Sequence, residues 1–120
     1  VYFVLNLNNR KKDIRNLIRQ IENIIIKFLD IYKVKSNSDK KNIGIWIKDK
    51  KIAAIGIRVS RWIAYHGFSI NIKNNLNDYK RILPCGLENE KITSLKNEKK
   101  DISNVKKNLK TIIQENLYKI

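Results

Sequence analysis

The hydrophobic residues along the chain follow two spacings, one typical of strands and one typical of helices. Residues 1–7, VYFVLNL, form an apolar run rich in β-forming side chains, which predicts a buried strand. Two later runs, residues 43–47 and 51–59, are separated by the polar residues 48–50 and predict a hairpin. Residues 66–72, HGFSINI, predict a further strand. These segments are the expected strands of a sheet.

Two other segments repeat apolar residues every three or four positions, which predicts amphipathic helices. The first begins at Ile14, directly after the candidate N-cap Asp13, and the second begins at Ile102. Their apolar positions are Ile14, Leu17, Ile18, Ile21, Ile25, Phe28 and Leu29, and Ile102, Val105, Leu109, Ile112, Ile113 and Leu117. Residues 33–42 and most of 73–86 are expected to be loops. The order strand, helix, strands, loop, helix predicts an α/β or α+β fold, a mixed sheet with packed helices.

The composition fits a folded domain in a reducing compartment. The chain has 120 residues, 42% hydrophobic and 31% charged, which suits one globular domain spanning residues 1–120. The apolar runs are too short to cross a bilayer, and one cysteine cannot form an internal disulfide. One cysteine and one histidine cannot build an ordinary zinc site either. We therefore expect a cytoplasmic protein with no membrane partner and no metal.

The formal net charge of +15 has two interpretations. A basic surface could attract a polyanion or an acidic protein. Alternatively, the abundance of Ile, Lys and Asn reflects the codon bias of an AT-rich genome, and the lysines are spread along the chain rather than gathered on one element. The charge by itself leaves both interpretations open.

The only cysteine, Cys85, lies between the only proline and a glycine. A lone cysteine is often a small buried hydrophobe. Here Pro84 fixes the backbone before the thiol, and Gly86 permits close approach of a ligand or another segment. A thiol displayed in this way is a candidate nucleophile. It must then be a thiolate, which requires a cation or a base nearby.

Two residues could activate this thiol. His66 is the only histidine, and a Cys-His pair is the first candidate. Lys51 is the second, because it leads directly into the apolar run IAAIGI, where its side chain could turn inward. Either residue has an ordinary alternative: the histidine could bond a neighbouring loop, and the lysine could belong to a solvated run with Lys48 and Lys50. Spacing alone does not decide between them.

Small residues inside two predicted strands suggest that something approaches closely. They occur in residues 53–56, AAIG, and in residues 66–69, HGFS. Tight packing between sheet and helix would explain them, and so would a narrow groove for an acyl chain or a peptide. No glycine-rich phosphate-binding loop precedes a helix.

The blocks KIAAIGIRVSR (51–61), HGFSIN (66–71) and PCG (84–86), in this order and spacing, resemble the octanoyltransferases of lipoate biosynthesis. The resemblance covers essentially the whole chain. It implies the α/β fold shared by lipoate and biotin protein ligases. It also implies transfer of an octanoyl group from octanoyl-acyl carrier protein to a lysine of lipoyl domains, those of the 2-oxoacid dehydrogenases and the glycine cleavage H protein. No metal, nucleotide or organic cofactor is implied.

The resemblance also assigns roles to residues at matching positions. Cys85 is similar to the family's acyl-thioester nucleophile, and Lys51 to the residue that lowers the pKa of that thiol. Lys51 is thereby favoured over His66. The positions that match the two walls of the substrate site are Ala54, Ile55 and Gly56, and Gly67, Phe68 and Ser69.

The chain also departs from the family pattern. Family members carry an Arg-Gly-Gly and a Tyr-His-Gly-Pro-Gly-Gln segment before the first strand, and neither is present here. We therefore expect the C-terminal portion of an octanoyltransferase catalytic domain, with little or no activity alone. Two other functions compete: a basic nucleic-acid-binding module with Trp46 and Trp62 as stacking faces, and an ATP-dependent ligase, which the missing phosphate cradle disfavours.

Overall fold

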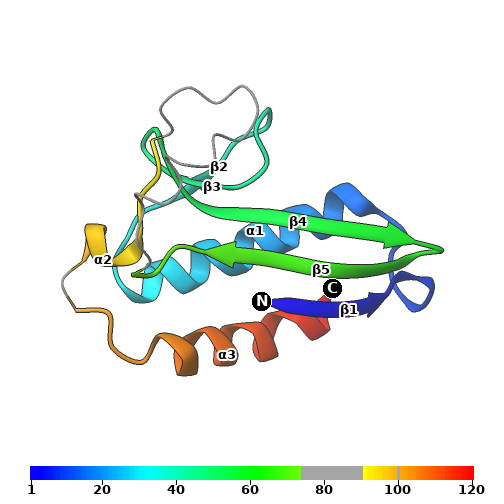
Figure 1. Ribbon diagram of the computed structural model, residues 1–120. Helices are drawn as coiled ribbons and strands as arrows, with labels where there is room; N and C mark the ends of the chain where they lie inside the picture. The colour runs from blue at the N-terminus through cyan, green and yellow to red at the C-terminus, as the bar shows by residue number, and fades with distance from the viewer. Residues whose placement is uncertain (74–90, 100) are drawn as a thin grey trace.

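The computed structural model describes residues 1–73, 91–99 and 101–120 (Figure 1). Its centre is a five-stranded sheet with the order β1-β5-β4-β3-β2, and each neighbouring pair is antiparallel. The strands are β1 (Tyr2–Asn6), β2 (Asn37–Ser38), β3 (Ile45–Ile47), β4 (Lys50–Ser60) and β5 (Ile63–Ile70). The helices are α1 (Ile14–Ile31), α2 (Leu95–Glu98) and α3 (Val105–Asn116), with 3-10 turns at Leu7–Asn9 and Leu117–Lys119. The predicted fold class, helices packed on a sheet, is confirmed.

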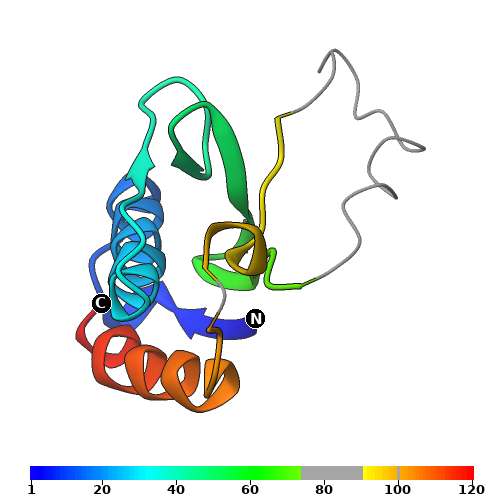
Figure 2. The same ribbon diagram turned by 90° about the vertical axis from the view of Figure 1, so that its left-hand side faces the viewer.

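The long strands β4 and β5 turn one face toward the helices and leave the other open. In β4, Ile55, Ile57 and Val59 are half-buried, whereas the residues between them are exposed. Successive side chains of a strand point to opposite faces, so this alternation puts the apolar residues on the core side. Figure 2 shows α1 and α3 together on one side of the sheet.

Helix α1 supplies much of the core. The side chain of Asp13 accepts a hydrogen bond from the backbone N–H of Asn16 (3.0 Å), which confirms the predicted N-cap. The helix buries one stripe of apolar side chains, namely Leu17, Ile21, Ile24, Ile25, Phe28 and Leu29. Ile14 was expected on this face but is 41% exposed, because the first turn projects beyond the core. The 3.6-residue spacing therefore predicted the helix and most of its buried face.

Helix α3 lies beside α1. It begins at Val105 rather than at the predicted Ile102, directly after Asn104 in the left-handed conformation (φ 59°). The Tyr32 hydroxyl at the end of α1 donates to the backbone carbonyl of Ser103 (2.8 Å) and accepts from Nδ2 of Asn108 (3.1 Å). No residue of α3 is fully buried, so this helix covers the margin of the core rather than filling it.

Strands β4 and β5 are joined by an unusual two-residue turn. Its residues, Arg61 and Trp62, both have positive φ (50° and 63°). Turns of this kind favour Asn-Gly, because larger side chains are strained at positive φ. The segment after β1 holds the turn in place: the N–H of Leu7 donates to the Trp62 carbonyl (2.7 Å), and Nδ2 of Asn8 donates to the Arg61 carbonyl (3.2 Å).

Three expectations from the sequence were wrong in detail. Strand β5 begins at Ile63 rather than at residue 66, because no glycine or asparagine marks the turn before it. Residues 33–42, expected to be loop, contain the short strand β2. Strand β1 is an edge strand rather than a buried one. Its Tyr2 and Val4 are 88% and 73% exposed, because only the opposite face meets the core.

Gly67 allows β1 to pair closely with β5. A Cβ atom at this position would lie 2.1 Å from the carbonyl oxygen of Val1, and the φ of Gly67 is +158°. Gly56, its direct partner across the β4–β5 ladder, has no atom within 4 Å of the equivalent position. The two paired glycines therefore have different structural roles: one permits a contact, and the other leaves open space.

We predict that Gly67→Ala lowers the free energy of unfolding by about 1–3 kcal/mol, because the added methyl group collides with the β1 backbone. Gly56→Ala is the matched control and should leave stability unchanged or raise it slightly, since its methyl group meets nothing and alanine lowers the entropy of the unfolded chain. Urea unfolding measures both. Equal stability of the two variants would contradict the close approach at Gly67.

Candidate active site

A shallow hollow of about 370 Å³ lies on the open face of β4 and β5. It is lined by Ala54, Ile55 and Gly56 of β4, by residues 66–69 of β5, and by Val1 and Tyr2. The structure thus brings together all six residues that the sequence assigned to the two walls of a substrate site. Their role in binding stays a prediction. His66, Val1 and Tyr2 complete the lining, and no pattern in the sequence pointed to the first two residues of the chain.

The floor of this hollow is made of residues with little or no side chain. Gly56 pairs directly with Gly67, and Ala54 pairs with Ser69 one step along the ladder. Because these positions share the open face, the sheet is bare at its centre. The side chain of Phe68, which is 6% exposed, belongs to the hydrophobic core on the other face of the sheet.

His66 is turned out of the regular strand geometry. Its φ is +69°, although it lies within β5. Its ring is 4.8 Å from that of Tyr65, measured between centroids, and the side chain is exposed. Consecutive residues of a regular strand point to opposite faces, so the positive φ is what brings the two rings together.

The backbone of Lys51 is held at the start of β4 by neighbours on both sides. On one side Lys51 pairs with Trp46 of β3. On the other, Lys51 N–H donates to the carbonyl of Lys91 (2.8 Å), and Thr93 N–H donates to the carbonyl of Lys51 (3.0 Å). This second contact is an isolated parallel bridge between Lys51 and Ile92. The five described strands themselves pair only in the antiparallel sense, which differs from the mixed sheet expected from the sequence.

The side chain of Lys51 extends across a glycine toward an indole ring. A Cβ atom on Gly44 would lie 2.7 Å from Cε of Lys51 and 2.8 Å from the carbonyl oxygen of Ala53, so only glycine fits beneath the lysine. The Lys51 ammonium is 5.6 Å from the centroid of the Trp46 ring, a distance suited to a cation–π contact. Gly44 and Trp46 lie two residues apart in the segment GIW. That small-then-aromatic pattern is the signal from which they could have been assigned to the site.

Two carboxylates at this end of the sheet have pKa values shifted by their surroundings. Burial raises the pKa of Glu22 on α1, although the charge of Arg19 and the backbone N–H of Gly44 oppose the increase. The hydrogen bond from Lys91 lowers the pKa of Asp49, with which it forms an ion pair. Asp49 thereby ties the segment after residue 90 to the β3–β4 turn, close to Lys51.

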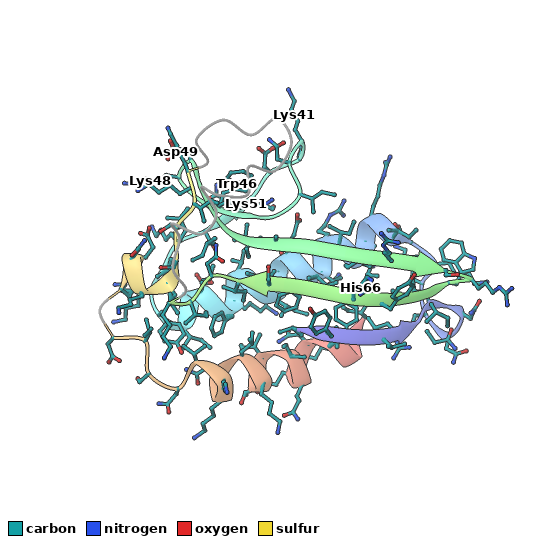
Figure 3. All side chains as sticks on the ribbon, viewed as in Figure 1. Lys41, Trp46, Lys48, Asp49, Lys51 and His66 are labelled. Atoms are coloured by element: carbon teal, nitrogen blue, oxygen red, sulfur yellow. The ribbon has the colours of Figure 1, made fainter. Side chains whose placement is uncertain are left out.

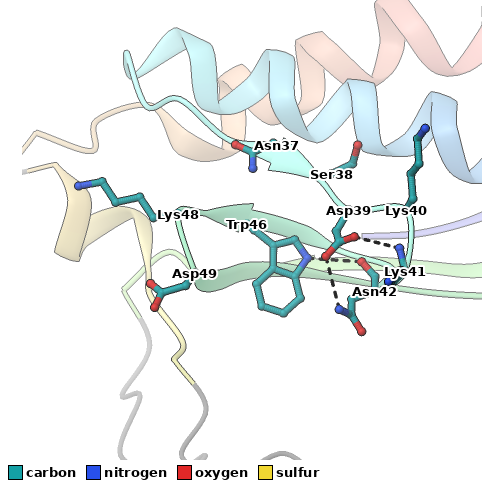
Figure 4. A pocket seen from close by; sticks show the side chains of 9 residues that line it. All are labelled: Asn37, Ser38, Asp39, Lys40, Lys41, Asn42, Trp46, Lys48 and Asp49. Atoms are coloured by element: carbon teal, nitrogen blue, oxygen red, sulfur yellow. Dashed lines mark hydrogen bonds between the residues drawn. The ribbon is translucent and has the colours of Figure 1, made fainter.

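A second hollow, of about 520 Å³, lies beside Trp46 (Figure 4). Its wall is formed by residues 37–42 together with Trp46, Lys48 and Asp49. In Figure 4 the ammonium groups of Lys40 and Lys48 point away from the indole ring rather than converging on it. The arrangement offers no focused anion site. Its clearest structural role is to seat Trp46, whose indole N–H donates to the carbonyl of Asn42 (3.4 Å).

Lys51 and His66 lie far apart on the sheet (Figure 3). His66 pairs with Ile57, six residues beyond Lys51 in β4. At about 3.3 Å per residue, this places the two backbone positions about 20 Å apart. One thiol therefore cannot pair with both side chains, and the two activators weighed from the sequence exclude each other. Cys85, with Pro84 and Gly86, lies outside the described residues.

The described part of the chain contains neither a metal-binding cluster nor a membrane-spanning helix. Residues 1–73, 91–99 and 101–120 contain no group of three or more His, Cys, Asp or Glu side chains able to hold a metal ion. In the same ranges, no helix combines the length and the apolar character that a membrane span requires.

The chain is similar to octanoyltransferases from several bacteria. It is 41% identical over 119 residues to the enzyme named octanoyltransferase from Prochlorococcus marinus strain MIT 9515, which covers 98% of this chain and 56% of that protein. It is 46% identical over 102 residues to the octanoyltransferase from Rickettsia bellii, covering 79% of this chain and 49% of that protein. The chain therefore spans about half the length of the curated relatives it matches.

Solved structures share the fold at low sequence identity. A putative lipoate protein ligase from T. acidophilum, solved with bound lipoic acid, has a TM-score of 0.76 and 15% identity over 98% of this chain and 50% of its own. A biotin protein ligase from Aquifex aeolicus has a TM-score of 0.73 and 17% identity over 98% of this chain and 51% of its own. These likenesses confirm the ligase-type fold expected from the sequence. The model of the lipoyl protein ligase A/B catalytic domain matches residues 1–115, and the chain belongs to that family.

Proposed function

We propose that the protein containing this chain transfers an octanoyl group to a lysine of lipoyl domains, with octanoyl-acyl carrier protein as the donor. One observation carries the proposal. In a chain of this family, the six residues assigned to a substrate site from the sequence line a single hollow. The similarity to octanoyltransferases, at 41% and 46% identity, supports the choice of acyl group.

The proposed reaction has two steps. The Cys85 thiolate attacks the carbonyl carbon of the octanoyl thioester, a carbon–sulfur bond forms, and the carrier thiol departs with a proton. The deprotonated amine of the acceptor lysine then attacks the new thioester. An amide forms, the Cys85 thiolate is released, and the proton lost by the amine nitrogen returns to the Lys51 amine, which gave its own proton to the carrier thiol in the first step. Atoms and charges balance without a metal, a nucleotide or a redox cofactor.

Lys51 is proposed to stabilise the thiolate and to supply the proton to the departing thiol. Chain connectivity is compatible with this pairing, and the family resemblance favours Lys51 over His66. Lys91 follows Cys85 by six residues and is hydrogen-bonded to the backbone of Lys51. Six residues span at most about 22 Å when fully extended, which sets an upper limit on the separation between Cys85 and this point.

The hollow on β4 and β5 is proposed to hold the octanoyl chain. An eight-carbon chain gains free energy by leaving water, about 0.8 kcal/mol for each methylene that is fully buried. The bare floor at Gly56 and Gly67 gives it room, and Ala54 and the exposed ring of Tyr2 give it apolar surface. The hollow begins at Ala54. This residue follows Lys51 by three positions in β4, a distance of about 10 Å. That separation suits a chain whose carboxyl end is at Lys51.

We predict that Cys85→Ser abolishes formation of an octanoyl adduct, because a serine hydroxyl is not ionised at neutral pH. The protein that contains this chain is mixed with octanoyl-pantetheine, and its intact mass is measured. The parent should gain one octanoyl group, removable by hydroxylamine. Adduct formation by the serine variant at the parent rate would contradict the assignment of Cys85.

The choice between Lys51 and His66 can be tested by thiol alkylation, since Cys85 is the only cysteine. Removing a cation disfavours the thiolate, so Lys51→Ala should move the pH midpoint of iodoacetamide alkylation upward. His66→Ala serves as the matched comparison and should move the midpoint less. A larger shift from the histidine variant would show that the lysine pairing is wrong.

We predict that Gly56→Val slows acylation of Cys85 by octanoyl-pantetheine at least about tenfold while leaving the fold intact. The valine side chain would stand at the centre of the hollow, where no atom now lies within 4 Å of the Cβ position. Ser60→Val adds a similar side chain to an exposed position of the same strand, outside the hollow, and should acylate normally. Equal acylation rates in both variants would place the acyl chain elsewhere.

A further inference from the structure

The side chain of Lys51 must be held in one place if its charge is to act at one place. A lysine side chain is long and flexible, and ordering it is among the most costly in lost rotamer freedom. The backbone hydrogen bonds to Lys91 and Thr93 fix where this side chain begins. They do not fix where its ammonium group ends. A second set of contacts has to supply that part of the geometry.

A β-bulge sets the face of the sheet to which Lys51 points. In the pairing of β4 with β3, Ala53 lies opposite Ile45. The next pair joins Lys51 to Trp46, so Ile52 is an extra residue without a partner in β3. Ile52 and Ala53 are 0% and 2% exposed, so two consecutive residues face the core and the alternation of the strand is broken. Lys51 therefore lies on the open face, where the hollow on β4 and β5 also lies.

Gly44 and Trp46, called the lysine seat, receive the side chain on this face. Gly44 leaves the necessary space, since a Cβ atom there would lie 2.7 Å from Cε and 3.3 Å from Nζ of Lys51. The Lys51 ammonium lies over the ring of Trp46, 5.6 Å from its centroid. The indole N–H donates to the carbonyl of Asn42, which orients the ring. Figure 4 shows this ring on the side of β3 that faces away from α1, in agreement with the direction set by the bulge.

The lysine seat holds the ammonium without neutralising it. A carboxylate would also hold a lysine, but it would cancel much of the positive charge that favours a nearby thiolate. Asp49, the acid nearest to Lys51 along the chain, is paired with Lys91. Within residues 1–73, 91–99 and 101–120, the other ion pair is that of Lys11 with Asp13. An aromatic ring attracts a cation through its quadrupole and carries no net charge, so the charge of the seated ammonium stays uncompensated.

We propose that Trp46 is a positioning residue for Lys51, whose ammonium it holds on the open face of the sheet beside the hollow, where the proposed reaction needs a positive charge. This inference rests on the proposed function. Gly44 contributes by making room for the lysine side chain. Because Trp46 acts through Lys51, loss of the ring should weaken the effect of the lysine on the nucleophile without removing the cation itself.

The pH midpoint of Cys85 alkylation by iodoacetamide, followed by mass spectrometry of the Cys85 peptide, tests this role in the protein that contains the chain. Trp46→Leu keeps the lysine but removes the ring, and should move the midpoint upward by at least half of the shift that Lys51→Ala causes. Trp46→Phe retains an aromatic face and should keep most of the parent behaviour. Trp62 is the matched control, because the Lys12 ammonium lies 5.7 Å from its ring. Trp62→Leu should leave the midpoint unchanged.

A purely structural role of Trp46 is separated from positioning by repeating its substitution without the lysine. In the Lys51→Ala background, Trp46→Leu should cause no further shift, because substitutions that act through one group are not additive. An equal shift in both backgrounds would overturn the proposal. So would an unchanged midpoint when Trp46→Leu is made in the presence of Lys51.

Proton NMR of the folded parent protein gives a second measurement, which needs no substitution of Trp46. Protons above the face of an aromatic ring resonate upfield, so the Cε protons of Lys51 should lie upfield of those of an exposed lysine such as Lys107. Lys51→Ala identifies the resonances by their loss. Resonances of Lys51 at the exposed position would overturn the proposal. Shifted resonances together with an unchanged alkylation midpoint in Lys51→Ala would refute the proposed function of Lys51 and leave its seat on Trp46 standing.

Discussion

The backbone pairing of β4 with β5 is the interaction on which the rest of the structure depends. Eight consecutive residue pairs join the two strands, from Ala53–Ile70 to Ser60–Ile63. Because the register is fixed over this length, the apolar side of the hairpin meets α1, and the small residues of both strands coincide on the other side. A slip of one residue would exchange the two faces and remove both the core contacts and the hollow. Packing and site are therefore set by the same register.

The sequence predicted those parts of the fold that depend on local periodicity. The 3.6-residue spacing located α1 and its buried stripe, and Asp13 marked the N-cap correctly. The turn at Arg61–Trp62 was missed, because its conformation is imposed by hydrogen bonds from residues more than fifty positions away. The conversion of the first strand into an edge strand was missed for a similar reason, since strand order is a property of the whole sheet.

The candidate site, like the fold, could be predicted from the sequence only in part. Runs of small residues indicated that something approaches β4 and β5 closely, and the hollow lies there. The segment GIW carried a signal, but its position against the Lys51 side chain could not be predicted, because it depends on the pairing of β3 with β4. The distance between Lys51 and His66 could not be predicted either, because it depends on which residues of β4 and β5 pair. The strand pairing places Lys51 and His66 so far apart that only one of them can activate Cys85.

The contacts on either side of residues 72–90 have a consequence for how this family can vary. Asn71 N–H donates to the carbonyl of Ile52 (2.9 Å), and the carbonyl of Lys91 accepts from the N–H of Lys51 (2.8 Å). The stretch between them, which carries the cysteine, thus leaves from and returns to adjacent residues of one strand. The entropy of joining two fixed ends by a chain segment changes only by about 0.6 kcal/mol for each doubling of the segment's length. A stretch anchored in this way can gain or lose residues with little effect on the sheet, so the residues around Cys85 can evolve while the scaffold stays constant.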